Sequence, residues 1–325
     1  MCCEEKERTN NMGINEIGRF GGIPTSWNNP LNKILINPWQ NIFNIQKMWN
    51  TAGANNPTQA ETNYLAALGG KANGNVLRAQ NMTPAQLKTT IEDSSSAIKT
   101  SQDKINDIAT GQNLDDNMSK LLGDYQTARS KIEQNGGPEV QAALQQIDTI
   151  NAKIIELQNQ QALTGASGSV SQAAGDNSLA NDQNNAANSI QQEITALEQQ
   201  RAALEAQIKN SVGEEDYKAY AEARDAYGSA GAEEINKIRD GMVDSQMDLS
   251  AAEITQDNPG YVRNQRNALS DIRSTCSDNA KAANSATDNI INTLAQDMVK
   301  NGKATSVAEA KKAIQAQMSA SSTTT

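Results

Sequence analysis

The sequence predicts an all-α protein: an elongated helical bundle with antiparallel coiled-coil hairpins and an N-terminal, partly extended arm. Long stretches of the chain carry apolar residues at alternating steps of three and four, the spacing of one face of a helix. No stretch alternates with period two over several β-branched residues, so strand content should be minimal. The seven prolines fall outside these periodic stretches, and five of them follow asparagine or threonine, as helix starts do.

The first segment, 1–55, is predicted to be a docking arm. All three tryptophans and both phenylalanines of the 325-residue chain lie between Phe20 and Trp49. Asn29-Pro30 and Asn37-Pro38 each begin a run of the form Asn-Pro-apolar-x-x-Ile-apolar, which predicts two capped helical turns after an extended connector. The second turn continues as a short amphipathic helix. The predicted docking residues are Trp27, Leu31, Ile34, Leu35, Trp39, Ile42, Phe43, Ile45, Met48 and Trp49.

Three docking surfaces remain open for this arm: another protein subunit, the chain's own helical body, and the headgroup region of a membrane. Tryptophan's preference for membrane interfaces supports the third surface. The small number of lysines beside the apolar face weakens it. Docking on another subunit is favoured.

The second segment, 56–135, is predicted to hold three helices. The first covers 57–68 and ends at Gly69-Gly70, the second runs from Thr83-Pro84 to Gly111, and the third covers 114–134. The middle helix has a heptad pattern with two small polar residues in it, which weakens packing and suits a wide bundle. Its pattern consists of Leu87, Ile91, Ser94, Ile98, Ser101, Ile105 and Ile108.

The third segment, 136–212, is predicted to be an antiparallel helical hairpin. It starts after Gly136-Gly137-Pro138, and a loop rich in Gly, Ala, Ser and Asn is expected over 164–185. Two apolar stripes flank that loop, with Arg201 in one position of the second stripe. The stripes consist of Ala143, Ile147, Ile150, Ile154 and Leu157, then Ile190, Ile194, Leu197, Leu204 and Ile208.

The fourth segment, 213–304, is predicted to be a bundle of long helices. Three tyrosines at helical spacing, Tyr217, Tyr220 and Tyr227, are interpreted as the partly buried face of a helix rather than a surface for stacking on bases or sugars. Asn258-Pro259 starts the last long helix, which ends at Asn301-Gly302. The final segment, 305–325, is predicted to be a short helix with a capping box, followed by a disordered tail from Ser319.

Composition points to a protein that works through partners. Hydrophobic residues make up 37% of the chain, and many of these are alanines that bury little surface. Neighbouring subunits are therefore expected to contribute to stability, which predicts a homo-oligomer. The net charge of −10 argues against a nucleic-acid-binding face, because such a face needs clustered Lys and Arg.

The sequence offers no catalytic residue, cofactor site or metal site. It contains no histidine, and Cys2, Cys3 and Cys276 form neither a CxxC pair nor a metal cluster. Gly69-Gly70-Lys71 lacks the first glycine and the Ser/Thr of a phosphate-binding loop. The paired carboxylates lie at predicted helix starts, where acidic side chains favour the helix dipole. They are Asp115-Asp116, Glu214-Glu215-Asp216 and Glu233-Glu234.

The chain resembles the internal or ejection proteins of short-tailed bacteriophages. The shared features are a Met-Cys start, a helical body rich in Ala, Gln and Asn, the absence of histidine and a Ser/Thr tail. The resemblance implies a non-enzymatic virion protein that is stored in the capsid near the portal and passes down the tail. It implies a homo-oligomeric ring or tube that contacts portal, tail or core proteins and the host envelope. No functional residue carries over, because no motif matches one.

Two other classes remain open. One is a tail fibre or needle built from a parallel trimeric coiled coil, which requires long uninterrupted heptads. The other is a secreted translocator or tip protein of a bacterial injection system, for which the aromatic arm would be the membrane-binding element.

Overall fold

The computed structural model describes residues 59–256 and 259–323, and these form seven helices with no strand among them. The all-α prediction is therefore confirmed for the described part of the chain, and the arm, 1–55, lies outside it. The helices are α3 (Gln59–Gln80), α4 (Pro84–Ala109), α5 (Asp116–Ala173), α6 (Asn177–Val212), α7 (Glu214–Thr255), α8 (Pro259–Lys300) and α9 (Val307–Thr323).

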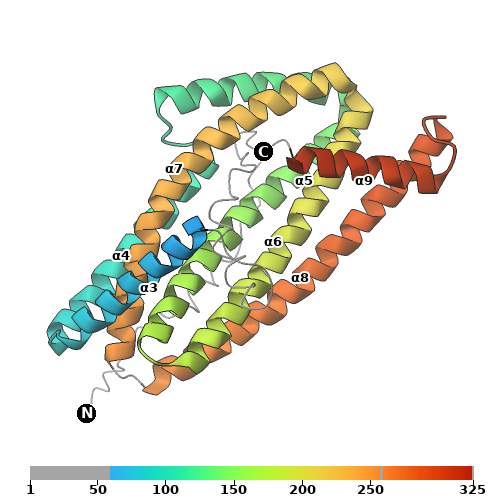
Figure 1. The fold of residues 1–325 in the computed structure, drawn as a ribbon. Coiled ribbons are helices and arrows are strands. Elements are labelled where there is room, and N and C mark those ends of the chain that lie inside the picture. Colours follow the sequence, from blue (N-terminus) through green and yellow to red (C-terminus); the bar gives the residue numbers. More distant parts are fainter. Residues whose placement is uncertain (1–58, 257–258, 324–325) are drawn as a thin grey trace, which may run out of the picture.

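The long helices lie side by side in an elongated body (Figure 1). In order across the body, α4 packs on α7, α7 on α5, α5 on α6, and α6 on α8. Helix α3 lies against α5 and α7, and α9 lies against α8 and α6. After its kink at Gly137, α5 runs in the same direction as α7, because Asn159 meets Arg239 while Ser167, further along α5, meets Ser250, further along α7.

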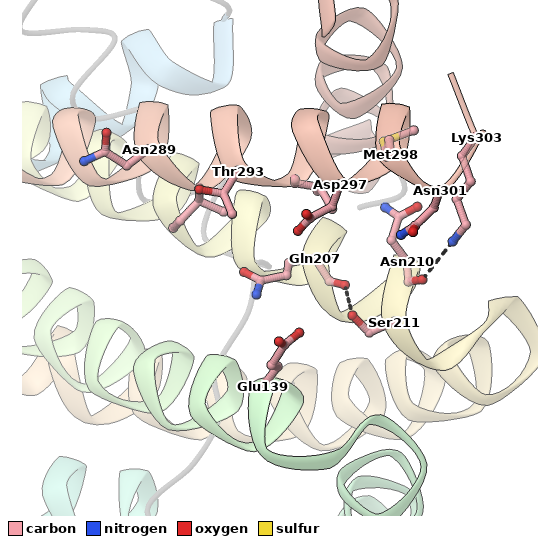
Figure 2. A pocket seen from close by; sticks show the side chains of 12 residues that line it. Glu139, Gln207, Asn210, Ser211, Asn289, Thr293, Asp297, Met298, Asn301 and Lys303 are labelled. Atoms are coloured by element: carbon pink, nitrogen blue, oxygen red, sulfur yellow. Dashed lines mark hydrogen bonds between the residues drawn. The ribbon is translucent and has the colours of Figure 1, made fainter. Parts of the chain in front are cut away.

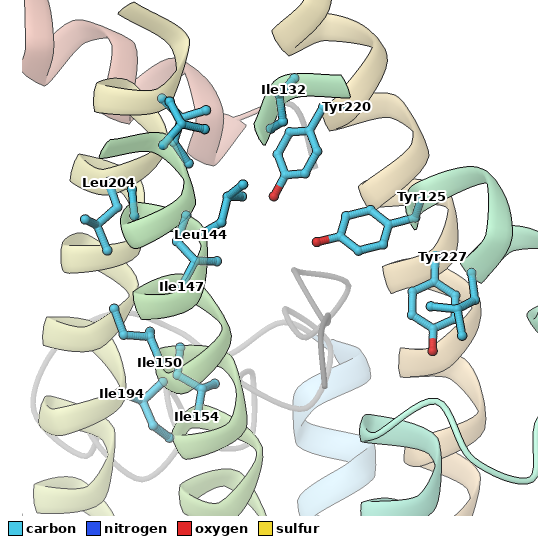
Figure 3. Packing of buried hydrophobic residues seen from close by; sticks show 14 of the residues in the cluster. Tyr125, Ile132, Leu144, Ile147, Ile150, Ile154, Ile194, Leu204, Tyr220 and Tyr227 are labelled. Carbon is cyan, nitrogen blue, oxygen red and sulfur yellow. The ribbon is translucent and has the colours of Figure 1, made fainter. Parts of the chain in front are cut away.

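The largest apolar core lies where α5, α6 and α7 meet (Figure 3). The residues predicted from periodicity to form the apolar stripes of α5 and α6 fill it: Ala143, Ile147, Ile150, Ile154, Leu157, Ile190, Ile194, Leu204 and Ile208 are buried, and Leu197 is half-buried. Each fully buried large aliphatic side chain stabilises the fold by about 1.5–3 kcal/mol. The helical spacing of apolar residues in the sequence therefore predicts which side chains of α5 and α6 form this core.

Helix α5 changes direction at Gly137, whose backbone has φ 65° and ψ −158°. Glycine adopts a positive φ without the steric cost that a Cβ imposes. Pro138 follows, where a missing N–H donor costs little because helical bonding restarts there. Gly136 lies against Val140 and Val212, and a Cβ built on it would be 2.7 Å from Val212 Cγ1. The two glycines therefore set the angle between residues 116–136 and the rest of α5.

Replacing Gly136 with alanine is expected to lower the free energy of unfolding by about 1–3 kcal/mol, because the added methyl overpacks the contact with Val140 and Val212. Gly123, also in α5, has no neighbouring atom within 4 Å of a Cβ. Gly123→Ala is a matched control and should stabilise the protein by about 0.4–1 kcal/mol. Urea unfolding followed by circular dichroism compares the two variants. Equal changes in the free energy of unfolding of the two variants would show that Val140 and Val212 move to accommodate the added methyl. The close approach at Gly136 would then not contribute to stability.

The prediction of a loop over 164–185 is wrong. Helix α5 continues to Ala173, and α6 begins at Asn177 after a short turn in which Gly175 has φ 86°. The small side chains that suggested a loop are buried in helix–helix contacts instead, where their size lets backbones approach. They include Ala166, Ser167, Gly168 and Ser171. Composition alone could not separate a flexible loop from a closely packed small-residue helix.

Two more expected helix ends are wrong. Helix α3 runs through Gly69-Gly70 to Gln80, because Ala72, Val76 and Ala79 pack against α5 and α7 and hold the helix beyond the glycines. Helix α9 extends to Thr323, so helix also covers 319–323, part of the tail that was expected to be disordered. Burial on a neighbour outweighs about 1 kcal/mol of glycine penalty per residue.

The helix starts follow the sequence signals more closely. At Thr83 a capping box forms: Thr83 Oγ1 accepts from Gln86 N at 3.3 Å, and Gln86 Oε1 accepts from Thr83 N at 2.8 Å. Ser306 Oγ accepts from Glu309 N at 3.2 Å at the start of α9. The heptad positions of α4 face the interior as predicted, because Leu87, Ser94, Ile98 and Ile105 are buried.

Candidate functional site

The most polar part of the interior is a cluster of tyrosine, arginine and carboxylate side chains from α5, α6 and α7, here called the tyrosine–arginine cluster. Its aromatic members lie close together (Figure 3): the ring centroids of Tyr125 and Tyr220 are 5.7 Å apart, those of Tyr125 and Tyr227 6.4 Å, and those of Tyr217 and Tyr220 6.1 Å. The cluster consists of Tyr125, Arg129, Asp148, Arg201, Glu205, Tyr217, Tyr220, Arg224 and Tyr227.

Arg129 joins the two parts of α5 across the kink. Its guanidinium donates to both carboxylate oxygens of Asp148 at 3.0 Å, to Tyr125 Oη at 3.0 Å and to Glu133 Oε1 at 2.7 Å. Its side chain is only 3% exposed. Burial alone lowers the pKa of Arg129, but Tyr125 and Asp148 outweigh burial and leave it above its usual value. The charged form is therefore held by a bidentate pair of the strongest kind.

Arg201 and Arg224 share one carboxylate. Arg224 Nη1 lies 3.0 Å from Glu205 Oε1, and Arg201 Nε lies 3.7 Å from the same oxygen. The Arg224–Glu205 contact is an ion pair without the alignment of a hydrogen bond. Arg201 also donates to Asn151 Oδ1 at 3.2 Å, and Arg224 pairs with Asp225 at 2.9 Å.

The environment moves the pKa values of these two arginines in opposite directions. Burial lowers the pKa of Arg201, and Glu205 and Glu198 only partly oppose that shift. Burial also acts to lower the pKa of Arg224, but Glu205 and Tyr220 outweigh it, and the value lies well above the usual one. The carboxylate of Glu205 thus stabilises Arg224 more than Arg201.

The tyrosines have no acid–base role near neutral pH. Burial raises the pKa of Tyr217 and of Tyr227 to about 12 and raises that of Tyr220 well above its usual value. Their hydroxyls therefore stay protonated, and their rings pack against one another in the interior. The interpretation of Tyr217, Tyr220 and Tyr227 as a partly buried helix face is confirmed. The cluster holds three helices in register and provides no group that would react.

A second polar feature is a pocket of about 420 Å³ formed by α5, α6, α8 and the start of the α8–α9 connection (Figure 2). The carboxylates of Glu139 on α5 and Asp297 on α8 point toward it from opposite sides. Lys303 Nζ donates to the Asn210 carbonyl oxygen at 3.2 Å near the end of α6. Amide and hydroxyl side chains line it together with the apolar side chains of Ile290, Leu294 and Met298 on α8, so the pocket offers both polar and apolar contacts.

Among the described residues no group of three or more Cys, Asp or Glu side chains is placed to hold a metal ion. Cys276 is a buried free thiol, and burial raises its pKa to about 12, so it is a poor nucleophile. Within the described part of the chain, none of the helices combines the length and apolarity needed to cross a membrane.

The predicted docking residues, Trp27 to Trp49, all lie outside the described residues, and that prediction stays open. The sequence alone did not predict that these tyrosines, arginines and carboxylates form one cluster. Two features of the sequence pointed to parts of it: Arg201 occupies a position in an apolar stripe, and the three tyrosines of α7 recur at helical spacing. Arg129 had none, because its main partner, Asp148, lies beyond the kink. Comparison of the chain with protein-family models, with curated proteins and with solved structures gives no match.

Proposed function

We propose that this chain is a non-enzymatic structural protein of a virion, an oligomeric component of the genome-delivery apparatus of a tailed bacteriophage. It belongs in the capsid interior or the portal and tail region and enters the host envelope on delivery. Its partners are further copies of the chain, arranged as a ring, and portal, tail or core proteins. It needs no cofactor and reads no nucleic-acid sequence.

One contrast carries the proposal. The arm holds every tryptophan and phenylalanine of the chain, whereas the described helical body has few large apolar groups at its surface. Its exposed large hydrophobic side chains are Leu77, 61% exposed, and Val307, 39% exposed. Aromatic side chains dominate the energetics of protein interfaces. Strong apolar recognition therefore falls to the arm, and the body serves as its scaffold.

The shape of the body favours this scaffold over a fibre. A parallel trimeric fibre needs helices that continue in one direction, but α5 and α6 fold back on each other after a short turn. The alternating apolar stripes of these two helices support coiled-coil packing between them, which we include in the proposal. The buried ion pairs of the tyrosine–arginine cluster support a body that keeps one fixed arrangement when it is packed among neighbours.

The proposal predicts that the arm drives association. Replacing Trp39, Phe43 and Trp49 together with serine in the full chain should weaken self-association at least about tenfold, since aromatic anchors are the residues that contribute most at interfaces. Sedimentation velocity over a range of protein concentrations measures the effect. Leu77→Ser is the matched control, because it removes the most exposed large apolar side chain of the described body; it should leave the association unchanged.

Three outcomes would count against parts of this proposal. A full chain that stays monomeric at every concentration contradicts the oligomer. Binding of the wild-type chain to liposomes that the triple variant loses favours the injection-system class or a membrane-inserting version of delivery. Mass spectrometry of purified phage particles tests the virion assignment, and absence of the chain from particles whose genome encodes it would overturn that assignment.

A further inference from the structure

A small cavity lies inside the body where α5, α6, α7 and α8 meet. Its volume is about 20 Å³. Part of its wall is apolar, from Leu163, Leu269 and Ile272. The rest is polar, and it is formed by Gln160, Thr164, Ser167, Gln183 and Gln246. Four helices therefore contribute residues to one small cavity that has both apolar and polar walls.

One wall of the cavity is a triangle of hydrogen bonds between α5 and α7. Gln246 Nε2 donates to Ser167 Oγ and to Ser250 Oγ, both at 3.0 Å, and the two hydroxyls lie 2.9 Å apart. A hydroxyl group has one donor and two acceptor positions. Whichever serine donates to the other, Ser167 keeps one hydrogen-bonding position that the triangle does not use.

Gln183 of α6 also lines the cavity and is 1% exposed. Neither its amide nitrogen nor its amide oxygen has a hydrogen-bond partner in the protein. Buried polar side chains nearly always have a partner, in the protein or in ordered water. Leaving both amide atoms without one is strongly unfavourable in an interior. Gln183 therefore points to a polar ligand in the cavity that it lines.

We propose that this cavity binds one ordered water molecule, which accepts a hydrogen bond from Gln183 Nε2 and joins it to Ser167. The size fits, because a single water needs about 10–15 Å³ of such space. The chemistry fits as well, since a buried water typically makes about three hydrogen bonds to groups that lack other partners. The water links α6 to the α5–α7 triangle, which Gln183 does not reach directly.

The water site has a structural consequence for the bundle. Without the water, α6 faces the triangle with an unpartnered amide, and the contact between the helices is weakened. With it, one hydrogen-bonded layer crosses the interior from α6 through α5 to α7. Hydrogen bonds through a well-held water are nearly as favourable as direct ones.

The test uses the full chain and Gln183→Met, which keeps the length of the side chain and removes its hydrogen bonds. Oxygen-17 relaxation dispersion counts long-lived internal waters, and the variant should have one fewer than the wild type. Its Tm should fall by about 2–4 °C, because the water bridge between Gln183 and Ser167 is lost. The hydrogen-bonding position of Ser167 that the water occupied then has no partner. Gln199→Met, on the exposed side of α6, is the control and should change neither quantity.

An unchanged count of internal waters in Gln183→Met would overturn the proposal, and so would a rise in Tm, which would mean that the amide faced a dry cavity. If the variant does not fold, a crystal structure of the wild-type chain that resolves ordered waters decides the question. The proposal requires a water within hydrogen-bonding distance of both Gln183 Nε2 and Ser167 Oγ. Ordered waters elsewhere and none at this position would overturn it.

Discussion

Replacing Glu205 with glutamine is expected to lower the free energy of unfolding by about 3–5 kcal/mol, because it leaves buried arginines without their shared counter-charge. Glu205 is 5% exposed and Arg224 is 8% exposed, with 3.0 Å between their nearest charged atoms. Asp225 also pairs with Arg224, but it is 49% exposed, so water screens that contact. The glutamine amide fits the space and cannot replace the charge.

The measurement is equilibrium unfolding in urea at low and at moderate salt. Glu222→Gln is the matched control, since Glu222 is 69% exposed and its pair with Lys218 on the same helix spans 3.8 Å. That control should cost at most about 0.5 kcal/mol, and salt should reduce its effect further. The effect at Glu205 should survive salt, because the pair is buried. Similar losses in the two variants would show that the buried pair contributes no more than a surface pair.

The fold class could be predicted because it depends on local signals. The periodicity of residues such as Ile147 and Ile194 gives the helical face directly, and the Thr83-Pro84 pair marks a helix start by its own chemistry. The ends of helices depended on distant contacts instead. Gly69 stays helical because residues further along α3 pack on α5 and α7, and no local pattern contains that information.

The candidate site could be predicted only in part. Arg201 stood out because a charged residue occupies an apolar position, and Glu205 lies four residues further along the same helix, whereas its partner Asn151 follows from the packing of α5 against α6. The meeting of Arg129 with Asp148 depends on the angle at Gly137. A sequence shows a glycine pair before a proline and does not show which way the chain turns. Buried polar contacts that cross such a bend therefore cannot be predicted from the sequence alone.

The second large effect is expected at Glu253, near the end of α7. Burial raises the pKa of Glu253 to about 7, although a hydrogen bond from Tyr261 on α8 acts to lower it. The folded protein therefore holds a proton on this carboxyl at pH values where the unfolded chain, with an ordinary Glu pKa of about 4.3, has released it. By linkage, stability falls as the pH rises from about 4.5 to about 7, and the loss is complete above that range. Its size is roughly 3–4 kcal/mol.

Glu253→Gln should remove this loss, because glutamine stays neutral and still accepts from the Tyr261 hydroxyl. The variant should be more stable than the wild type by roughly 3–4 kcal/mol at pH 8 and nearly equal to it at pH 4.5. Urea unfolding across this pH range measures the difference, with Glu92→Gln on the exposed face of α4 as the control that should show no such slope. A constant difference between wild type and Glu253→Gln at all pH values would mean that the carboxyl titrates normally. In that case Glu253 is open to water beside Tyr261, and its negative charge does not lower the stability of the folded state.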